Sequence, residues 1–138
     1  MQSELLYTTS QAYLSDTIVT AGTGDSSLRL YGRGEGSVDW GGESGTIEWT
    51  NFPDLRPDGL FTPNVTGVIR LGDAAIMYRM AGISLEPDDA GIRHFVGSVQ
   101  WWTEATDYLW LNKRFGLEEG AITPDGALTS RVYDVTPA

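Results

Sequence analysis

The sequence predicts an all-β protein, an antiparallel β-barrel of about 8–10 strands, and three observations support this. Short segments with alternating apolar and polar residues recur along the chain, and that two-residue period gives a strand two distinct faces. Turn-forming clusters rich in Gly, Pro, Asn and Asp separate these segments. No segment has the apolar spacing of a helix of three turns. Short strands joined by short connections are typical of a barrel or a sandwich.

The N-terminal part of the chain predicts two strands and a turn. Residues 4–14 (ELLYTTSQAYL) alternate imperfectly, but Tyr, Thr and Leu suit a half-buried strand. The AGTGDS cluster at 21–26 predicts a turn, and residues 27–33 (SLRLYGR) alternate cleanly. The glycine-rich segment 34–42 predicts a bend or bulge.

The middle of the chain predicts three strands. Residues 45–50 place Ile47 and Trp49 on one face and Glu48 on the other. The segment NFPDLRPDG that follows at 51–59 contains two prolines and a PDG turn, so it predicts a loop. Residues 64–71 and 75–85 predict two strands joined by the hairpin turn LGDA.

The C-terminal part predicts a long strand and two shorter ones. Residues 91–103 alternate, with His94 on one face and Phe95 on the other. A short turn at 104–107 leads to 108–112 (YLWLN), the strongest apolar run, which predicts a strand. The segment 118–128 predicts a loop, and 129–135 (TSRVYDV) predicts the last strand.

Length, charge and composition exclude several classes of function. A chain of 138 residues fits one β-barrel domain over 1–138. A net charge of −10 argues against nucleic-acid partners and anionic membrane surfaces. The absence of cysteine excludes thiolate metal sites, and a single histidine excludes multi-histidine sites, so we expect no metal and no cofactor. With no secretory signal and no apolar run of about 20 residues, the expected location is cytoplasmic.

The candidate catalytic residues are polar side chains on predicted strands with apolar or aromatic neighbours. They are Glu48, His94, Tyr78 and Arg79. A carboxylate inside an apolar barrel would have a raised pKa, and a histidine titrates near neutrality without help, so either could move a proton. Tyr78 and Arg79 could hold an oxyanion or a carboxylate. The alternative is structural: His94 lies at the surface and Glu48 pairs with an arginine across the sheet.

The aromatic residues favour a binding pocket. Five tryptophans, among them Trp40, Trp49 and Trp110, exceed what a core of this size needs. Tryptophan offers an apolar body and one polar group, which suits a flat or cyclic ligand. A tryptophan-rich core or a subunit interface would use the same residues.

Two motifs carry a resemblance to a known family. EWTN at 48–51 and YLWLN at 108–112, with the order of Gly, Asp and Tyr residues around them, resemble the bacterial family catalogued as domain of unknown function 3237. The resemblance spans about residues 28–135. It implies a single-domain barrel, lipocalin-like or allene-oxide-cyclase-like in architecture, and no settled activity. If the two motifs meet at one barrel mouth, Trp49, Asn51, Trp110 and Asn112 line a single pocket.

Three functions remain open from the sequence. The first is a cofactor-free lyase, isomerase or cyclase that uses acid/base chemistry on a small cyclic or aromatic metabolite. The second is a lipocalin-like protein that binds a small hydrophobic molecule without catalysis. The third is an interaction module with its tryptophans between subunits. In each case we expect a homo-oligomer, because small aromatic-rich barrels often bury a strand face between copies.

Overall fold

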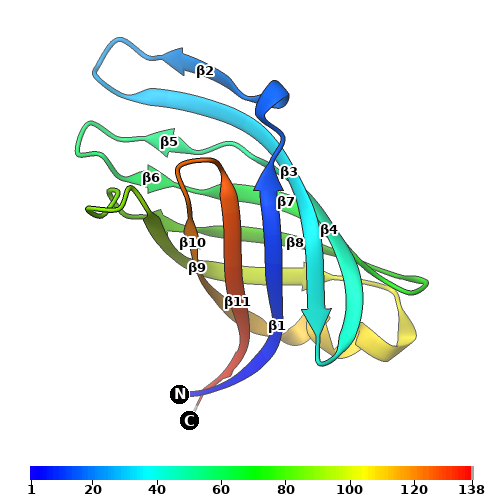
Figure 1. Cartoon of the computed structure of the whole chain (residues 1–138). Coiled ribbons are helices and arrows are strands. Elements are labelled where there is room, and N and C mark those ends of the chain that lie inside the picture. The colour runs from blue at the N-terminus through cyan, green and yellow to red at the C-terminus, as the bar shows by residue number, and fades with distance from the viewer. Residues whose placement is uncertain (138) are drawn as a thin grey trace.

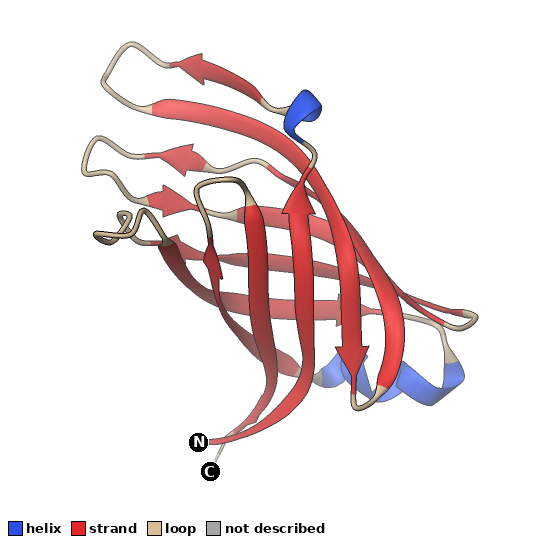
Figure 2. Ribbon diagram, in the orientation of Figure 1, coloured by secondary structure: helices blue, strands red, loops and turns tan. Residues whose placement is uncertain are grey.

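The computed structural model describes residues 1–137 and consists mainly of β-strands (Figures 1 and 2). In chain order, the elements are β1 (Gln2–Tyr13), η1 (Ser15–Thr17), β2 (Val19–Gly22), β3 (Leu28–Trp40), β4 (Glu43–Asn51), β5 (Asp54–Leu55), β6 (Phe61–Thr62), β7 (Asn64–Leu71), β8 (Ala74–Ser84), β9 (Arg93–Trp102), η2 (Thr106–Lys113), β10 (Phe115–Ile122) and β11 (Ala127–Thr136). The elements η1 and η2 are 3₁₀ helices. Neither is long and apolar enough to cross a membrane.

Eight long strands close into an antiparallel barrel. Around the barrel the order is β1, β11, β10, β9, β8, β7, β4, β3 and back to β1. The pairing of β1 with β3 joins the two edges of the sheet, so that no edge strand is left between them. The antiparallel β-barrel expected from the sequence is confirmed.

The two ends of the barrel differ. At one end β2, β5 and β6 continue the sheet beyond the barrel, beside the start of β3 and the end of β8 (Figure 1). We call this the open end, because the cavity described below is reached there. At the other end η2 lies against the end of β9 (Figure 2). The side chain of Leu111 in η2 is completely buried and closes the barrel at that end.

Alternation along each strand separates interior from exterior. In β8, Ile76, Tyr78 and Met80 are buried, whereas the intervening Met77 and Arg79 are exposed. The interior is polar as well as aromatic, since Gln11, Asn51, Glu118 and Ser130 are also buried. Three further polar residues are buried as well: Thr9, Ser84 and Asp134.

Two local predictions are wrong. The run at 108–112 belongs to the 3₁₀ helix η2 and not to a strand. The segment at 118–128, expected to be a loop, forms most of β10 and the turn into β11. Most of the glycine-rich segment at 34–42 belongs to β3, which continues to Trp40. Gly34 faces the interior there, where a Cβ atom would overlap the Trp49 ring, so glycine makes room for the indole.

Candidate functional site

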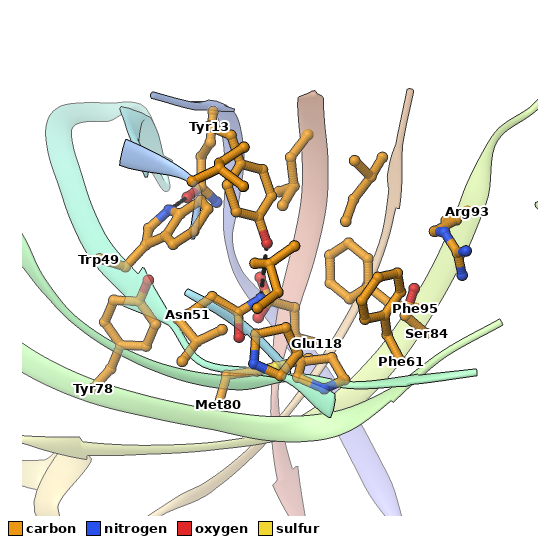
Figure 3. Close-up of a pocket in the computed structure, with 18 residues that line it drawn as sticks. Tyr13, Trp49, Asn51, Phe61, Tyr78, Met80, Ser84, Arg93, Phe95 and Glu118 are labelled. Atoms are coloured by element: carbon orange, nitrogen blue, oxygen red, sulfur yellow. Dashed lines mark hydrogen bonds between the residues drawn. The ribbon is translucent and has the colours of Figure 1, made fainter. Parts of the chain in front are cut away.

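A cavity of about 190 Å³ opens at the open end of the barrel (Figure 3). Its walls are mainly apolar and aromatic, and they include Tyr13, Trp49, Phe61, Tyr78, Met80 and Phe95. An apolar cavity of about 150 Å³ is large enough to hold benzene. The cavity is therefore of a size for one ring with a short substituent.

Glu118 is a buried carboxyl group in the wall of the cavity. Its side chain extends from β10 and is 8% exposed. No Arg, Lys or His side chain among residues 1–137 forms an ion pair with it. Burial therefore raises the pKa of Glu118 to about 7, although the hydrogen bond from Ser130 acts in the opposite direction. A carboxyl group with this pKa can both give and accept a proton near neutral pH.

A chain of hydrogen bonds determines which oxygen of Glu118 is free. The Ser130 hydroxyl donates to Glu118 Oε2 over 2.7 Å and lies 2.6 Å from Thr9 Oγ1. Gln11 Nε2 donates to Thr9 Oγ1 over 2.7 Å, which leaves the Thr9 proton for Ser130. Because Oε2 accepts a hydrogen bond, a proton on Glu118 resides on Oε1. That oxygen makes no hydrogen bond to residues 1–137, so it is available to a ligand.

The same chain continues to the aromatic wall of the cavity. The indole Nε1–H of Trp49 donates a hydrogen bond to Gln11 Oε1, and Gln11 Nε2 donates one to Thr9 Oγ1. The ring of Trp49 is thereby fixed against the cavity. Hydrogen bonds through Gln11, Thr9 and Ser130 therefore connect this ring to Glu118.

Two phenol groups stay protonated beside Glu118. Burial, followed by the charge of Glu118, raises the pKa of Tyr78 well above its usual range. The same two causes, in the same order, raise the pKa of Tyr7, whose hydroxyl accepts a hydrogen bond from Trp101 Nε1 over 3.2 Å. The Tyr78 hydroxyl has no hydrogen-bond partner among residues 1–137 and its ring lines the cavity. It is a free donor for a ligand oxygen.

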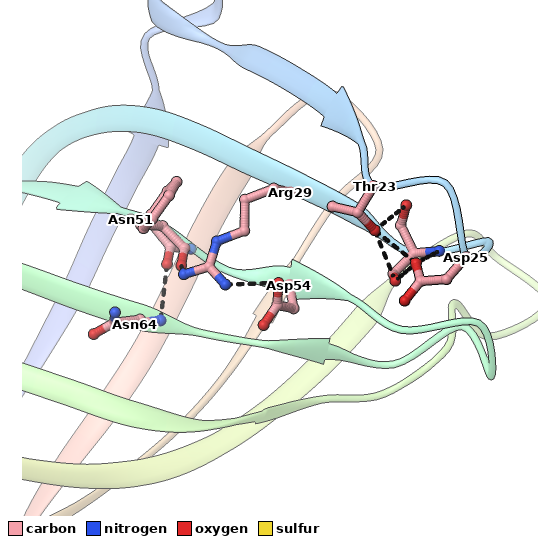
Figure 4. A network of polar contacts seen from close by, with 8 residues as sticks. Thr23, Asp25, Arg29, Asn51, Asp54 and Asn64 are labelled. Carbon is pink, nitrogen blue, oxygen red and sulfur yellow. Dashed lines mark hydrogen bonds and ion pairs between the residues drawn. The ribbon is translucent and has the colours of Figure 1, made fainter.

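Near the opening, polar contacts hold the rim in place (Figure 4). Asn51 Nδ2 donates to the Tyr13 hydroxyl over 2.8 Å, and Asn51 Oδ1 accepts from the Asn64 backbone over 3.0 Å. Beside them Arg29 forms an ion pair with Asp54 over 2.7 Å. Burial raises the pKa of Tyr13, so this phenol also stays neutral. These contacts join β4 to β1 and β7, and β3 to β5, around the opening.

Three of the predicted site residues line the cavity. They are Tyr78, Trp49 and Asn51. The other three catalytic candidates lie on the outer face of the barrel, which corrects the expectation that the four share one cavity. Glu48 pairs with Arg70 across the sheet over 3.0 Å, and His94 pairs with Asp88 over 3.2 Å.

Arg79 is the third outward residue. It donates to Gln100 over 3.1 Å, and its guanidinium lies 5.9 Å from the centre of the Trp102 ring. Adjacent residues of a strand face opposite sides, so Arg79 cannot line the cavity when Tyr78 does.

The expectation that Trp49, Asn51, Trp110 and Asn112 share one mouth is also wrong. Trp110 and Asn112 belong to η2 at the closed end and are exposed. Asn112 binds the backbone of Thr103 through both atoms of its amide group. Trp40 is at the closed end too, where its ring stacks on Tyr7 at 4.4 Å.

Sequence reasoning missed the residue with the clearest chemistry. The sequence predicts a loop at Glu118, and two acidic residues beside glycine are unusual in a strand interior. The available signal was the spacing Gly116, Glu118, Gly120, which puts three residues on one face of a strand. The two glycines leave space for rings, since Cβ atoms there would overlap Trp101 and contact Phe95 closely. No group of three or more His, Asp or Glu side chains in residues 1–137 is arranged to hold a metal ion.

Comparison with solved structures shows the same barrel in other proteins. A protein of unknown function from Clostridium acetobutylicum superimposes with a TM-score of 0.86 at 21% identity, covering 99% of this chain and 100% of the other. A beta-barrel like protein from Acinetobacter baumannii gives 0.84 at 18% identity, covering 98% and 96%. An enzyme from Penicillium herquei gives 0.65 at 16% identity, covering 95% and 93%.

No protein-family model and no curated protein sequence matches this chain. The resemblance to the domain-of-unknown-function family 3237 therefore stays a prediction. At these identities the structural matches show a shared fold. Together with the cavity, they describe a barrel suited to binding a small molecule.

Proposed function

We propose that this protein is a cofactor-free enzyme that moves a proton on a small ring-containing molecule held in the barrel cavity, as a lyase, isomerase or cyclase would. The observation that carries the proposal is Glu118, an acid without a cationic partner in the wall of an apolar cavity, with its pKa raised to about 7. The enzyme from Penicillium herquei with a similar fold is consistent with catalysis in such a barrel.

The residues around Glu118 fit proton transfer beside a carbonyl group. Glu118 in its ionised form removes a proton from the carbon next to the carbonyl, and the electron pair of that C–H bond moves to the carbonyl oxygen. The neutral Tyr78 hydroxyl donates a hydrogen bond to this oxygen as its negative charge develops. Protonated Glu118 then returns the proton to a second atom of the same molecule, so that no cofactor is consumed.

The test is hydrogen–deuterium exchange at carbon. Small cyclic ketones are incubated with the protein in D₂O near pH 7.5, and exchange next to the carbonyl is followed by NMR. We expect the wild type to accelerate exchange and Glu118→Gln to lose about 10²-fold or more of that acceleration. The matched control is Glu119→Gln, because Glu119 is the next residue and is exposed on the outer face.

The second candidate is a binding protein without catalysis. The predominantly apolar lining of the cavity favours it, since binding alone needs no proton transfer. If Glu118→Gln binds the cyclic ketones as the wild type does and the wild type accelerates no exchange, the enzyme proposal fails and the binding function remains.

A further inference from the structure

The cavity has polar groups at two places and apolar walls between them. Glu118 and Tyr78 form the inner polar site, and Arg93 and Ser84 lie toward the opening. Figure 3 shows Trp49 and Tyr78 on one side of the cavity and Arg93 with Ser84 on the other. A ligand that satisfies both sites needs two polar groups separated by an apolar part.

Arg93 is held in place by groups that leave its charge unbalanced. Its Nη1 donates to the backbone oxygens of Leu85 over 2.9 Å and of Gly59 over 3.2 Å. Its guanidinium lies 4.5 Å from the centre of the Phe61 ring. Among residues 1–137, no carboxylate lies within 4.0 Å of it, although the chain has 19 acidic residues and 9 basic ones. The guanidinium group of Arg93 is therefore fixed in place, and its remaining N–H donors are free for a ligand anion.

Ser84 adds a second unpartnered group at the same place. Its side chain is 3% exposed, and its Oγ atom has no hydrogen-bond partner among residues 1–137. Ser84 is paired across the sheet with Phe95, two residues beyond Arg93, and both Ser84 and Arg93 line the cavity. A buried hydroxyl without a partner is unfavourable, and a ligand oxygen would satisfy it.

We infer that Arg93 and Ser84 form a carboxylate-binding subsite at the opening of the cavity, and that the ligand is a single-ring molecule with a carboxylate on a short side chain. This inference rests on the proposed function, because it orients the ring toward Glu118. The ionised form of Glu118 repels a carboxylate at the inner site, so the ligand's acid group must face the opening.

The spacing of the two sites agrees with a ligand of this kind. Glu118 is paired with Gly97, four residues along β9 from Arg93, which corresponds to about 13 Å along the strand. The arginine and glutamate side chains span part of that length. A ring with a side chain of about two carbons and a carboxylate covers the remainder, consistent with a cavity of about 190 Å³.

The probes for the test are 3-phenylpropanoate and its neutral amide, 3-phenylpropanamide. Binding is measured by tryptophan fluorescence and by amide NMR shifts at concentrations up to about 10 mM, which covers dissociation constants in the millimolar range. We expect the wild type to bind the carboxylate about tenfold more tightly than the amide. We expect Arg93→Gln to remove this preference, and Ser84→Ala to reduce it.

The matched control is Arg79→Gln. Arg79 also lies beside an aromatic ring, that of Trp102, but on the outer face of the barrel. We expect Arg79→Gln to leave the preference for the carboxylate over the amide unchanged. Thermal unfolding of each variant shows whether it folds, and Ser84→Ala, which removes a single oxygen, keeps the test decisive if Arg93→Gln is unstable.

The outcomes separate this inference from the proposed function. Equal binding of both probes, or a preference that survives both Arg93→Gln and Ser84→Ala, overturns the subsite and leaves proton transfer by Glu118 standing. A preference that depends on Arg93, without any acceleration of exchange, supports the subsite and overturns the enzyme. If the wild type binds neither probe, the subsite is overturned for this class of ligand.

Discussion

At the scale of single residues, the hydrogen bond from Ser130 tunes Glu118. It stabilises the ionised carboxylate and so opposes the effect of burial on the pKa. We expect Ser130→Ala to raise the pKa of Glu118 above the wild-type value of about 7. A ¹³C-carboxyl NMR titration measures this. Ser98→Ala is the control, since Ser98 is on β9 and bonds only the Ala81 backbone. An unchanged or lowered pKa in Ser130→Ala would contradict the proposed arrangement.

Alternation in the sequence identifies some site residues and excludes others. It places Trp49 and Tyr78 on the inward faces of their strands, and the structure agrees. The same period places Glu48 and Arg79, each one residue away, on the outward faces. The candidates chosen from the sequence could not all line one cavity, because two of them were direct neighbours of inward residues. The sequence does not identify Arg70 and Gln100 as the partners of Glu48 and Arg79, because cross-strand register depends on the whole sheet.

At the scale of elements, the least predictable segments are those whose environment comes from distant parts of the chain. The run YLWLN has the composition of a strand, yet η2 exposes Leu109 and Trp110 and buries only Leu111. The side-chain amide of Asn112 accepts a hydrogen bond from the backbone N–H of Thr103 and donates one to its carbonyl oxygen. These two bonds connect η2 to the end of β9. Strand β10 forms despite its paired acids and glycines because β9 and β11 flank it on both sides. Tertiary pairing outweighs local propensity in both segments.

The closure of the barrel by η2 depends on Leu111. Its side chain is completely buried, whereas Leu109 in the same helix is 48% exposed. We expect Leu111→Ala to lower the free energy of unfolding by about 2–5 kcal/mol, because it leaves a cavity in the closed end. Leu109→Ala should change it by no more than about 0.5 kcal/mol. Urea denaturation of both variants measures the difference. Equal effects would mean that η2 does not close the barrel.

At the scale of the whole molecule, the sequence predicts strands and turns but leaves barrel and sandwich as alternatives. The deciding contact is the pairing of β1 with β3, in which Thr8 to Tyr13 meet Gly34 to Asp39. β1 also pairs with β11 at the far end of the chain. Both faces of β1 are partly apolar, so its composition does not say which two strands flank it. Closure is a property of the whole sheet and its twist, and no single segment carries a signal for it.

Burial of Glu118 gives the stability of the barrel a definite dependence on pH. The pKa of this carboxyl rises from 4.5 when exposed to about 7 in the folded protein, so the folded state holds its proton where the unfolded state has lost it. The stabilisation is complete below pH 4.5 and is lost as pH rises through 7. The loss is on the order of 3 kcal/mol, from about 1.4 kcal/mol per pH unit.

In urea denaturation at a series of pH values, Glu118→Gln should gain stability relative to the wild type across this interval, because glutamine cannot ionise. Glu119→Gln, altered on the exposed outer face, should follow the wild type. Parallel curves for the wild type and Glu118→Gln would show that the folded protein does not hold this carboxyl in its neutral form.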